Sequence, residues 1–194
     1  MSELIFYTNP QSRGRIVRWM LEECGVDYRT VVVPYGPEMK SEPYISINPM
    51  GKVPAIVYAG KAVTETAAIV TCLADLFPAA NLAPPPEQRQ DYYRWLFFAA
   101  GPLEAALTNK SLGFELPADK SGMAGYGSYD LVVDTLAKKV SRAPYIAADN
   151  FTAADLYVGS HIGYGLRFGT LPNLAEFNDY FERISKRPAH VRAE

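Results

Sequence analysis

A proline-rich stretch at residues 81–86 divides the chain into two parts with different sequence patterns. Residues 1–80 alternate short β-branched runs with helical periodicity, which is the pattern of an α/β domain. Residues 87–194 show helical periodicity only. Because consecutive prolines form a stiff, extended connection, the sequence predicts an α/β domain at 1–80, a linker at 81–86 and an all-helical domain at 87–194.

The first part contains the elements of a small sheet and its helices. Apolar and β-branched runs predict strands at 4–7 and 28–33 and a hairpin at 55–63, and helical periodicity predicts helices at 15–24 and 66–76. Residues 35–49 are rich in proline and predict a loop with a helical turn near 41–45. A helix between the first two strands favours a parallel pair joined by a crossover.

The second part is predicted to be a set of helices. They are expected at 88–107, 129–140, 152–168 and 174–185, with a glycine-rich loop at 112–127. Gly101-Pro102 should bend or break the first helix, because proline lacks the N–H that a helix interior needs. Thr152 and Asp155 form a capping-box pair at the start of the third helix. We assign this pair to folding, so the loss of Asp155 should cost about 1 kcal/mol of stability.

Composition argues against several classes of function. The chain has 194 residues, of which 48% are hydrophobic and 21% charged, as expected for a globular protein with a sizeable core. Its net charge of -2 gives no electrostatic basis for binding nucleic acid or an anionic membrane. No apolar run reaches the ~18 residues of a membrane span, and the N-terminal sequence lacks the layout of a signal peptide. We therefore expect a cytoplasmic protein.

Few side chains are available for metal or redox chemistry. The two cysteines, Cys24 and Cys72, are far apart and lie in helical patterns, so we expect buried structural thiols instead of a dithiol centre. Of the two histidines, His161 is expected to pack within a helix and His190 to lie in a polar tail. With so few ligands, the sequence predicts no metal site and no histidine general base.

The segment from Asn48 to Pro54, with the sequence NPMGKVP, carries the first sign of a binding site. A proline that opens a strand cannot donate to the ladder, and Val53 before it is pushed into an extended conformation. If the bond between them is cis, the main chain of Val53 turns outward and can pair with another extended chain. The helix that begins near Thr64 directs free N–H groups toward an anion. These features suit a small, extended peptide that bears carboxylates.

Three motifs together resemble those of a cytosolic glutathione transferase, in the serine-type pattern of bacterial members. They are Tyr7-Thr8-Asn9-Pro10-Gln11-Ser12-Arg13, then Asn48-Pro49-x-Gly51-Lys52-Val53-Pro54 with Glu65-Thr66, and finally Thr152-x-x-Asp155. The likeness covers nearly the whole chain. It implies a thioredoxin-like N-terminal domain, an all-helical C-terminal domain, a homodimer and a role in detoxification. It also implies glutathione as a co-substrate, with no other cofactor.

The resemblance assigns residues to glutathione binding. Val53 is expected to pair its main chain with the cysteinyl unit, with the bond to the following proline cis. Glu65 offers a countercharge to the γ-glutamyl ammonium, and Thr66 offers a hydroxyl and helix-start N–H groups to its carboxylate; alternatively, a threonine here only caps the helix. Lys52, or else Lys40, is expected to face the glycyl carboxylate, unless these lysines are simply solvated.

Two hydroxyls compete to activate the glutathione thiol. Ser12 matches the serine of serine-type relatives and lies where the first helix starts, and it is our first choice. Tyr7 approximately matches the strand-end tyrosine of tyrosine-type relatives. Arg13 stands where beta-type relatives carry a cysteine, which argues against mixed-disulfide chemistry with the protein. Its guanidinium could stabilise the thiolate, or it could be a solvated arginine at the helix start.

The second substrate is expected to be a small apolar electrophile bound between the domains. The residues expected to line its pocket are Asn9, Gln11, Phe98, Leu103, Phe114, Tyr126 and Tyr164. For the five in the helical half, ordinary core packing is the alternative. The expected activity is conjugation of glutathione to the electrophile. The alternatives are glutathione-dependent peroxidase or disulfide reductase activity, and a binding module without catalysis.

Overall fold

The computed structural model describes residues 3–194, so residues 1 and 2, where the first expected domain begins, lie outside the described part. The chain divides into two compact units. One comprises the residues up to Leu82 together with Pro188–Glu194, and the other is Ala83–Arg187. The boundary between them therefore falls within the proline-rich stretch at residues 81–86.

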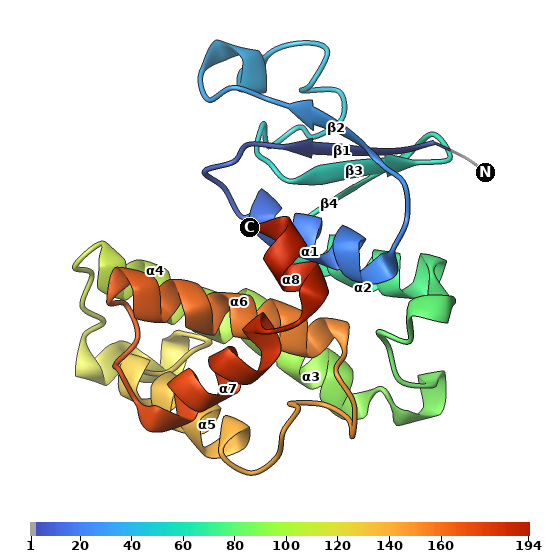
Figure 1. Ribbon diagram of the computed structural model, residues 1–194. Coiled ribbons are helices and arrows are strands. Elements are labelled where there is room, and N and C mark those ends of the chain that lie inside the picture. The colour runs from blue at the N-terminus through green and yellow to red at the C-terminus, as the bar shows by residue number, and fades with distance from the viewer. Residues whose placement is uncertain (1–2) are drawn as a thin grey trace. The chain divides into compact units, whose positions relative to one another are not determined.

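The first unit is built on a four-stranded sheet with the strand order β2-β1-β3-β4 (Figure 1). The strands are β1 (Leu4–Thr8), β2 (Arg29–Val32), β3 (Ala55–Tyr58) and β4 (Lys61–Thr64). The predicted parallel pairing of β1 with β2 and the predicted hairpin of β3 and β4 are confirmed, and β1 also pairs antiparallel with β3. With the helices described next, this sheet confirms the thioredoxin-like fold of the N-terminal domain.

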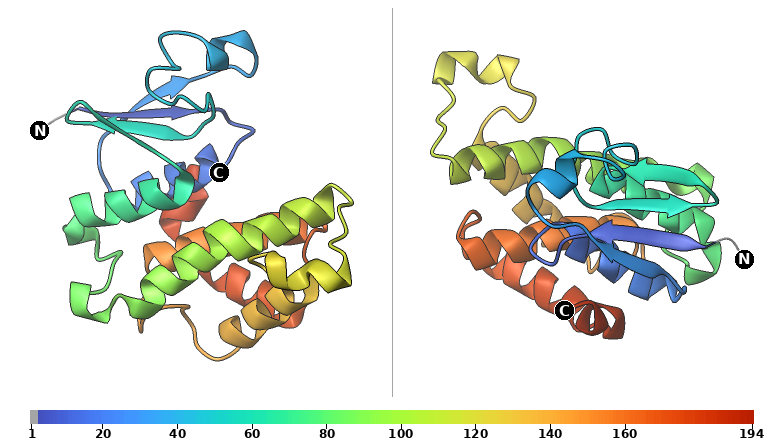
Figure 2. Two further views of the ribbon diagram at one scale, coloured as in Figure 1. Left: turned by 180° about the vertical axis from the view of Figure 1, so that it is seen from behind. Right: turned by 90° about the horizontal axis from the view of Figure 1, so that it is seen from above.

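Helices α1 (Gly14–Cys24) and α2 (Thr66–Leu76) lie on one face of this sheet, as both views along its edge show (Figures 1 and 2). The start of α1 presses on the end of β1, since a Cβ added to Gly14 would lie 1.9 Å from the Oγ1 of Thr8. Only glycine fits there. Because adjacent residues of a strand point to opposite faces, Thr8 faces α1 and Tyr7 faces away from it.

The opposite face of the sheet carries a second apolar cluster. Its members are Val33, Met39, Tyr44 and Ala55, with Tyr7, Ile47 and Val53 packed against them. The rings of Tyr7 and Tyr44 lie 5.6 Å apart, centroid to centroid. This cluster holds the long connection between β2 and β3 against the sheet. The helical turn expected near 41–45 is found as turns that follow a short 3-10 helix at Pro37–Lys40.

The second unit is helical, which confirms the all-α C-terminal region. The helix expected at 88–107 is observed as α3 (Gln90–Phe98), a π-helical turn (Ala99–Leu103) and α4 (Glu104–Ser111). Pro102 lies inside the π-helical turn, so the predicted break is confirmed. The remaining helices are α5 (Tyr129–Val140), α6 (Ala153–Phe168) and α7 (Ala175–Ser185), with short 3-10 helices at Pro86–Gln88 and Ala118–Met123. The predicted capping box of Thr152 and Asp155 is present at α6.

One helix of the structure was not predicted from the sequence. Residues 188–194 were assigned to the helical domain, with His190 in a polar tail, but α8 (Pro188–Ala193) packs on α1 of the first unit. The His190 ring lies edge-on against Trp19 at 4.5 Å, and Arg192 donates to a carboxylate oxygen of Glu22 at 2.9 Å. Pro188 follows the helix expected at 174–185, and proline, which cannot continue a helix, is favoured at the first position of a new one.

Cys24 and Cys72, expected to be buried structural thiols, are free and half-buried. Burial raises the pKa of the Cys24 thiol to about 12 and also raises that of Cys72. Neither is therefore a reactive thiolate near neutral pH. The expectation that His161 packs within a helix is confirmed, since it is buried in α6. Within residues 3–194, no helix has both the length and the apolar character needed to cross a membrane.

Candidate functional site

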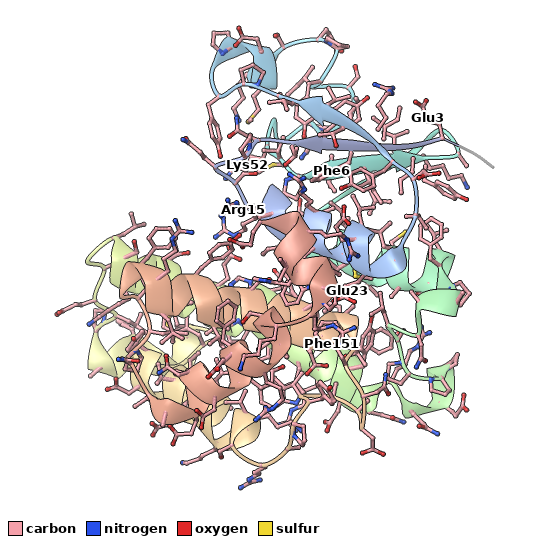
Figure 3. The ribbon with its side chains drawn as sticks, viewed as in Figure 1. Glu3, Phe6, Arg15, Glu23, Lys52 and Phe151 are labelled. Atoms are coloured by element: carbon pink, nitrogen blue, oxygen red, sulfur yellow. The ribbon has the colours of Figure 1, made fainter. Side chains whose placement is uncertain are left out.

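The register of the sheet gathers the predicted binding segments at one edge. Tyr7 in β1 is paired with Ala55 in β3, and Ala55 with Thr64 in β4. The end of β1, the start of β3 and the end of β4 therefore lie side by side. Figure 3 shows Lys52, just before β3, near this edge and Glu3, just before β1, at the opposite edge. The segments that lead out of these strand ends are those predicted to bind and activate glutathione.

The turn before β3 is fixed by hydrogen bonds of side chains. Asn48 is buried, and its side-chain amide donates to the carbonyl of Lys52 at 2.7 Å, while its carbonyl oxygen Oδ1 accepts from the N–H of Met50 at 3.1 Å. The Tyr44 hydroxyl donates to the same Lys52 carbonyl at 2.5 Å. Gly51 adopts a φ of 54°, and a Cβ there would lie 2.6 Å from the carbonyl of Met39. The turn thus has one geometry, and it requires glycine at position 51.

Val53 follows this turn and is followed by a cis bond to Pro54, as predicted. The ladder between β1 and β3 ends at Ala55, so the main chain of Val53 lies beyond it. Its side chain packs in the apolar cluster on the sheet. Val53 is therefore anchored by its side chain, and its peptide groups lie outside the strand ladder. This geometry suits pairing with an extended ligand.

The two lysines expected near a carboxylate differ in their surroundings. Lys40 donates from Nζ to the carbonyl of Met50 at 2.9 Å, so its ammonium is engaged with the turn. Lys52 is exposed at the edge of the sheet. Of the two, Lys52 presents its charge more directly at this edge.

Glu65 has the least ordinary backbone of the site. It lies immediately before α2 with φ 65° and ψ 118°, a conformation that non-glycine residues rarely adopt. A residue held in such a backbone conformation destabilises the folded state by on the order of 1–3 kcal/mol, and residues of this kind cluster at functional sites. No side chain caps α2, and its first backbone bond runs from Ile69 N–H to the Glu65 carbonyl. The alternative that a threonine caps this helix is therefore not observed, and its first N–H groups point out of the helix start.

Ser12 lies in the turn that opens α1. Its Oγ donates to the Asn9 carbonyl at 2.6 Å and accepts from the Gly14 N–H at 3.0 Å. The first turn of α1 contains no acidic residue, so the positive end of the helix dipole is not neutralised from within the helix. The start of α1 therefore favours negative charge nearby, while the proton of the Ser12 hydroxyl is donated to the Asn9 carbonyl.

Tyr7 and Arg13 are placed differently from Ser12. The Tyr7 ring belongs to the apolar cluster on the sheet face opposite α1. Arg13 occupies the residue before α1 with an exposed side chain. Of the three catalytic candidates, Ser12 and Arg13 lie at the start of α1 and Tyr7 points to the other side.

Asn9 and Gln11, expected in the electrophile pocket, belong to the same turn. The Asn9 side chain donates to the Val33 carbonyl at 3.1 Å and accepts from the Gln11 N–H at 3.0 Å. The Tyr35 hydroxyl donates to the Gln11 carbonyl at 3.2 Å. Asn9 therefore holds the turn to the end of β2, a structural role that the sequence did not reveal.

The other expected pocket residues lie in the second unit, in different environments. Leu103 is fully buried, as a core residue is, and Phe98 packs edge-on against Trp95 at 5.1 Å. Phe114 is exposed. Tyr126 accepts from the side chain of Asn109 at 2.9 Å, and Tyr164 stacks with Phe168 at 6.4 Å. Their part in a pocket with Asn9 and Gln11 stays a prediction.

Sequence reasoning missed three residues that shape the site: Thr8, Tyr44 and Asn48. A signal for Asn48 was available, because asparagine before a proline-glycine turn commonly binds the backbone two residues on. Thr8 and Tyr44 gave no signal, since their partners come from other segments of the chain.

Comparison with known proteins gives matches to one family model and to several proteins. Residues 12–76 match the family model of the glutathione S-transferase N-terminal domain. The disulfide-bond oxidoreductase YfcG of Escherichia coli is 26% identical over 96% of this chain and 92% of its own length. Maleylacetoacetate isomerase of Rattus norvegicus is 27% identical over 78% of this chain and 73% of its own.

Solved structures extend the likeness to both units. A glutathione transferase from Methylococcus capsulatus has a TM-score of 0.80 at 24% identity, over 98% of this chain and 96% of that one. A sphingomonad glutathione S-transferase, solved in complex with glutathione, has a TM-score of 0.77 at 25% identity, over 97% and 96% of the two chains. The protein thus shares the fold of these glutathione transferases, and its sequence matches the N-terminal domain model over residues 12–76 only.

Proposed function

We propose that this protein is a glutathione transferase of the serine type, which binds glutathione at the described edge of the sheet and activates it as a thiolate. The observation that carries the proposal is the register of β1, β3 and β4. It places the Ser12 turn, the Val53 peptide and the strained Glu65 before α2 at one edge. These are the groups that an extended peptide with a thiol between two charged ends would need.

Each group has a chemically matched role. Val53 would pair its peptide with the cysteinyl unit, and Glu65 would face the γ-glutamyl ammonium. The N–H groups and hydroxyl of Thr66 would hold the γ-glutamyl carboxylate, since a helix start stabilises an anion. Lys52 would face the glycyl carboxylate, with Lys40 as the weaker candidate because it is engaged with the Met50 carbonyl.

Ser12 would stabilise the thiolate. A free thiol with a pKa near ~8.5 is about 3% ionised at pH 7, and lowering the pKa to roughly 6.5 requires about 2.7 kcal/mol of preferential stabilisation. A hydroxyl hydrogen bond together with the positive end of α1 could supply this amount. Because a lower pKa also weakens the nucleophile, most of the acceleration must come from holding the apolar electrophile against the sulfur.

A second candidate is glutathione-dependent disulfide reduction. It is favoured by the similarity to YfcG over nearly the full length of both chains. No cysteine lies in the Ser12 turn, and Cys24 and Cys72 are both at helical positions away from it. Such chemistry would therefore use the glutathione sulfur and not a protein thiol. A homodimer, a cytoplasmic location and a role in detoxification are further parts of the proposal.

The decisive experiment has two steps. The protein is first tested for retention on immobilised glutathione, and failure to bind would refute the proposal. The thiol pKa of bound glutathione is then titrated by thiolate absorbance in the wild type and in Ser12→Ala, Tyr7→Phe and Arg13→Ala, with the exposed Ser46→Ala as a matched control. We expect Ser12→Ala alone to raise the pKa by roughly one to two units.

Turnover assays separate the activities. Conjugation of an aryl halide supports the transferase, and reduction of a glutathione mixed disulfide without conjugation supports the second candidate. Activity with an organic hydroperoxide alone would indicate a peroxidase. Binding without any turnover would indicate a module that does not catalyse.

A further inference from the structure

Thr8 carries a buried hydroxyl that has no role in the proposed chemistry. It is the last residue of β1 and exposes only 8% of its surface. Its Oγ1 lies 3.5 Å from the carbonyl oxygen of Asn9, beyond the 2.5–3.0 Å of an ordinary O–H···O hydrogen bond. Because buried polar groups almost always have a well-placed partner, this hydroxyl requires an explanation.

The same carbonyl is the acceptor of the Ser12 proton. Ser12 Oγ donates to the Asn9 oxygen at 2.6 Å, and the Ser12 N–H donates to it at 3.1 Å. A hydroxyl has a single proton to donate. Ser12 must therefore release the Asn9 carbonyl before its hydroxyl can donate to a sulfur. The carbonyl then loses the shorter of its two hydrogen bonds from Ser12.

Thr8 is placed to replace the bond that is lost. Its Oγ1 is held at the start of α1 by the close approach of Gly14. Its proton can rotate about the C–O bond, as in any hydroxyl. A shift of ~0.5 Å would bring the oxygen within ordinary hydrogen-bond distance of the Asn9 carbonyl.

We propose that Thr8 is a positioning residue, which donates to the Asn9 carbonyl when the Ser12 hydroxyl turns toward the glutathione sulfur. The inference rests on the proposed function of Ser12. No covalent bond is made or broken, and neither hydroxyl loses its proton. Thr8 replaces Ser12 as the hydroxyl donor to the Asn9 carbonyl. The turn thus keeps its hydrogen bonds while Ser12 donates to the thiolate.

A double-mutant cycle on the thiol pKa of bound glutathione tests this role. Thr8→Val removes the hydroxyl and keeps the side-chain shape, and it should raise the pKa by about half to one unit, the worth of one neutral hydrogen bond. Thr8→Ser keeps the hydroxyl and should restore most of the effect. In a Ser12→Ala background, Thr8→Val should cause no further shift, because Thr8 acts only through Ser12. The same change at the exposed Thr30 of β2 is the matched control.

The outcomes separate the inference from the proposed function. A shift in Ser12→Ala without one in Thr8→Val overturns the inference and leaves the function standing. An equal shift from Thr8→Val in both backgrounds also overturns it, since Thr8 would then act independently of Ser12. An unshifted pKa in Ser12→Ala overturns both. If thermal unfolding shows that valine is not tolerated against Gly14, Thr8→Ala carries the same test without the added methyl group.

Discussion

Asp155 is predicted to be the most costly single carboxylate to remove from the helical unit. It is fully buried and accepts four hydrogen bonds. The donors are the Ile146 N–H at 2.7 Å, the Thr152 N–H at 2.9 Å, the Thr152 hydroxyl at 3.0 Å and the Tyr180 hydroxyl at 2.7 Å. One side chain therefore ties the loop before α6, the start of α6 and the helix α7 together.

The magnitude follows from what Asp155→Ala leaves behind. The N–H groups of Ile146 and Thr152 and the hydroxyl of Tyr180 lose their acceptor in places that water does not reach, at about 1–3 kcal/mol each. Part of this loss is offset, because the variant no longer has to bury a charged carboxylate. Burial raises the pKa of Asp155 although its hydrogen bonds act in the opposite direction, which shows that burying the charge is costly. We expect a net loss of about 3–5 kcal/mol, well above the ~1 kcal/mol that a helix cap alone would give.

Urea denaturation measures the loss as a shift of the midpoint at constant slope. The chain offers a matched control in Ser128, the exposed cap of α5, whose Oγ accepts from the Leu131 N–H at 3.1 Å. Ser128→Ala should cost about 1 kcal/mol. Equal losses at the two positions would refute the argument that the buried network, and not the cap, carries the energy. If Asp155→Ala kept its full stability but lost activity, the assignment of Asp155 to folding would be wrong.

Three further predictions concern the first unit. Gly51→Ala should destabilise the protein by more than about 1 kcal/mol and weaken glutathione binding. The control is Gly60→Ala, because Gly60 also has a positive φ but an added Cβ there would meet no atom within 4 Å. Equal unfolding midpoints for the two variants would contradict the predicted clash at Gly51. Glu65→Gly should relieve backbone strain and leave stability equal or up to about 1 kcal/mol higher while it weakens binding, which calorimetry on both properties would test. The Arg192 hydrogen bond lowers the pKa of the Glu22 carboxyl in the folded state. The stability that this ion pair adds to the folded state is therefore present above the unfolded pKa of about 4.3, and it is lost as the pH falls through the folded pKa. The difference in thermal midpoint between the wild type and Arg192→Ala should therefore be small at pH 7 and vanish in acid.

Local signals in the sequence were sufficient for most of the fold. The expected and observed bounds of α2 agree at Thr66–Leu76, where a phenylalanine-proline pair ends the helix, and those of α5 agree at Tyr129–Val140. These signals failed where one residue type is common both at the end of a helix and at the start of the next. Pro188 can stop one helix or start the next, and only the contact of α8 with α1 decides between them. A sequence pattern carries no information on such a contact between distant segments.

The candidate site shows the same limit at finer scale, in the choice between Tyr7 and Ser12. Which side chain of β1 faces α1 depends on the parity of the strand, and a shift of one residue reverses it. Alternating hydrophobicity usually reveals this parity, but both faces of this sheet are covered, one by helices and the other by the apolar cluster around Tyr44. Residues 4–7 of β1, which point to both faces in turn, are consequently all apolar, and the alternation disappears in this strand. The close approach of Gly14 to Thr8 supplies what the pattern lacked: it turns Thr8 toward the start of α1 and Tyr7 away, and so favours Ser12 as the hydroxyl that meets the thiolate.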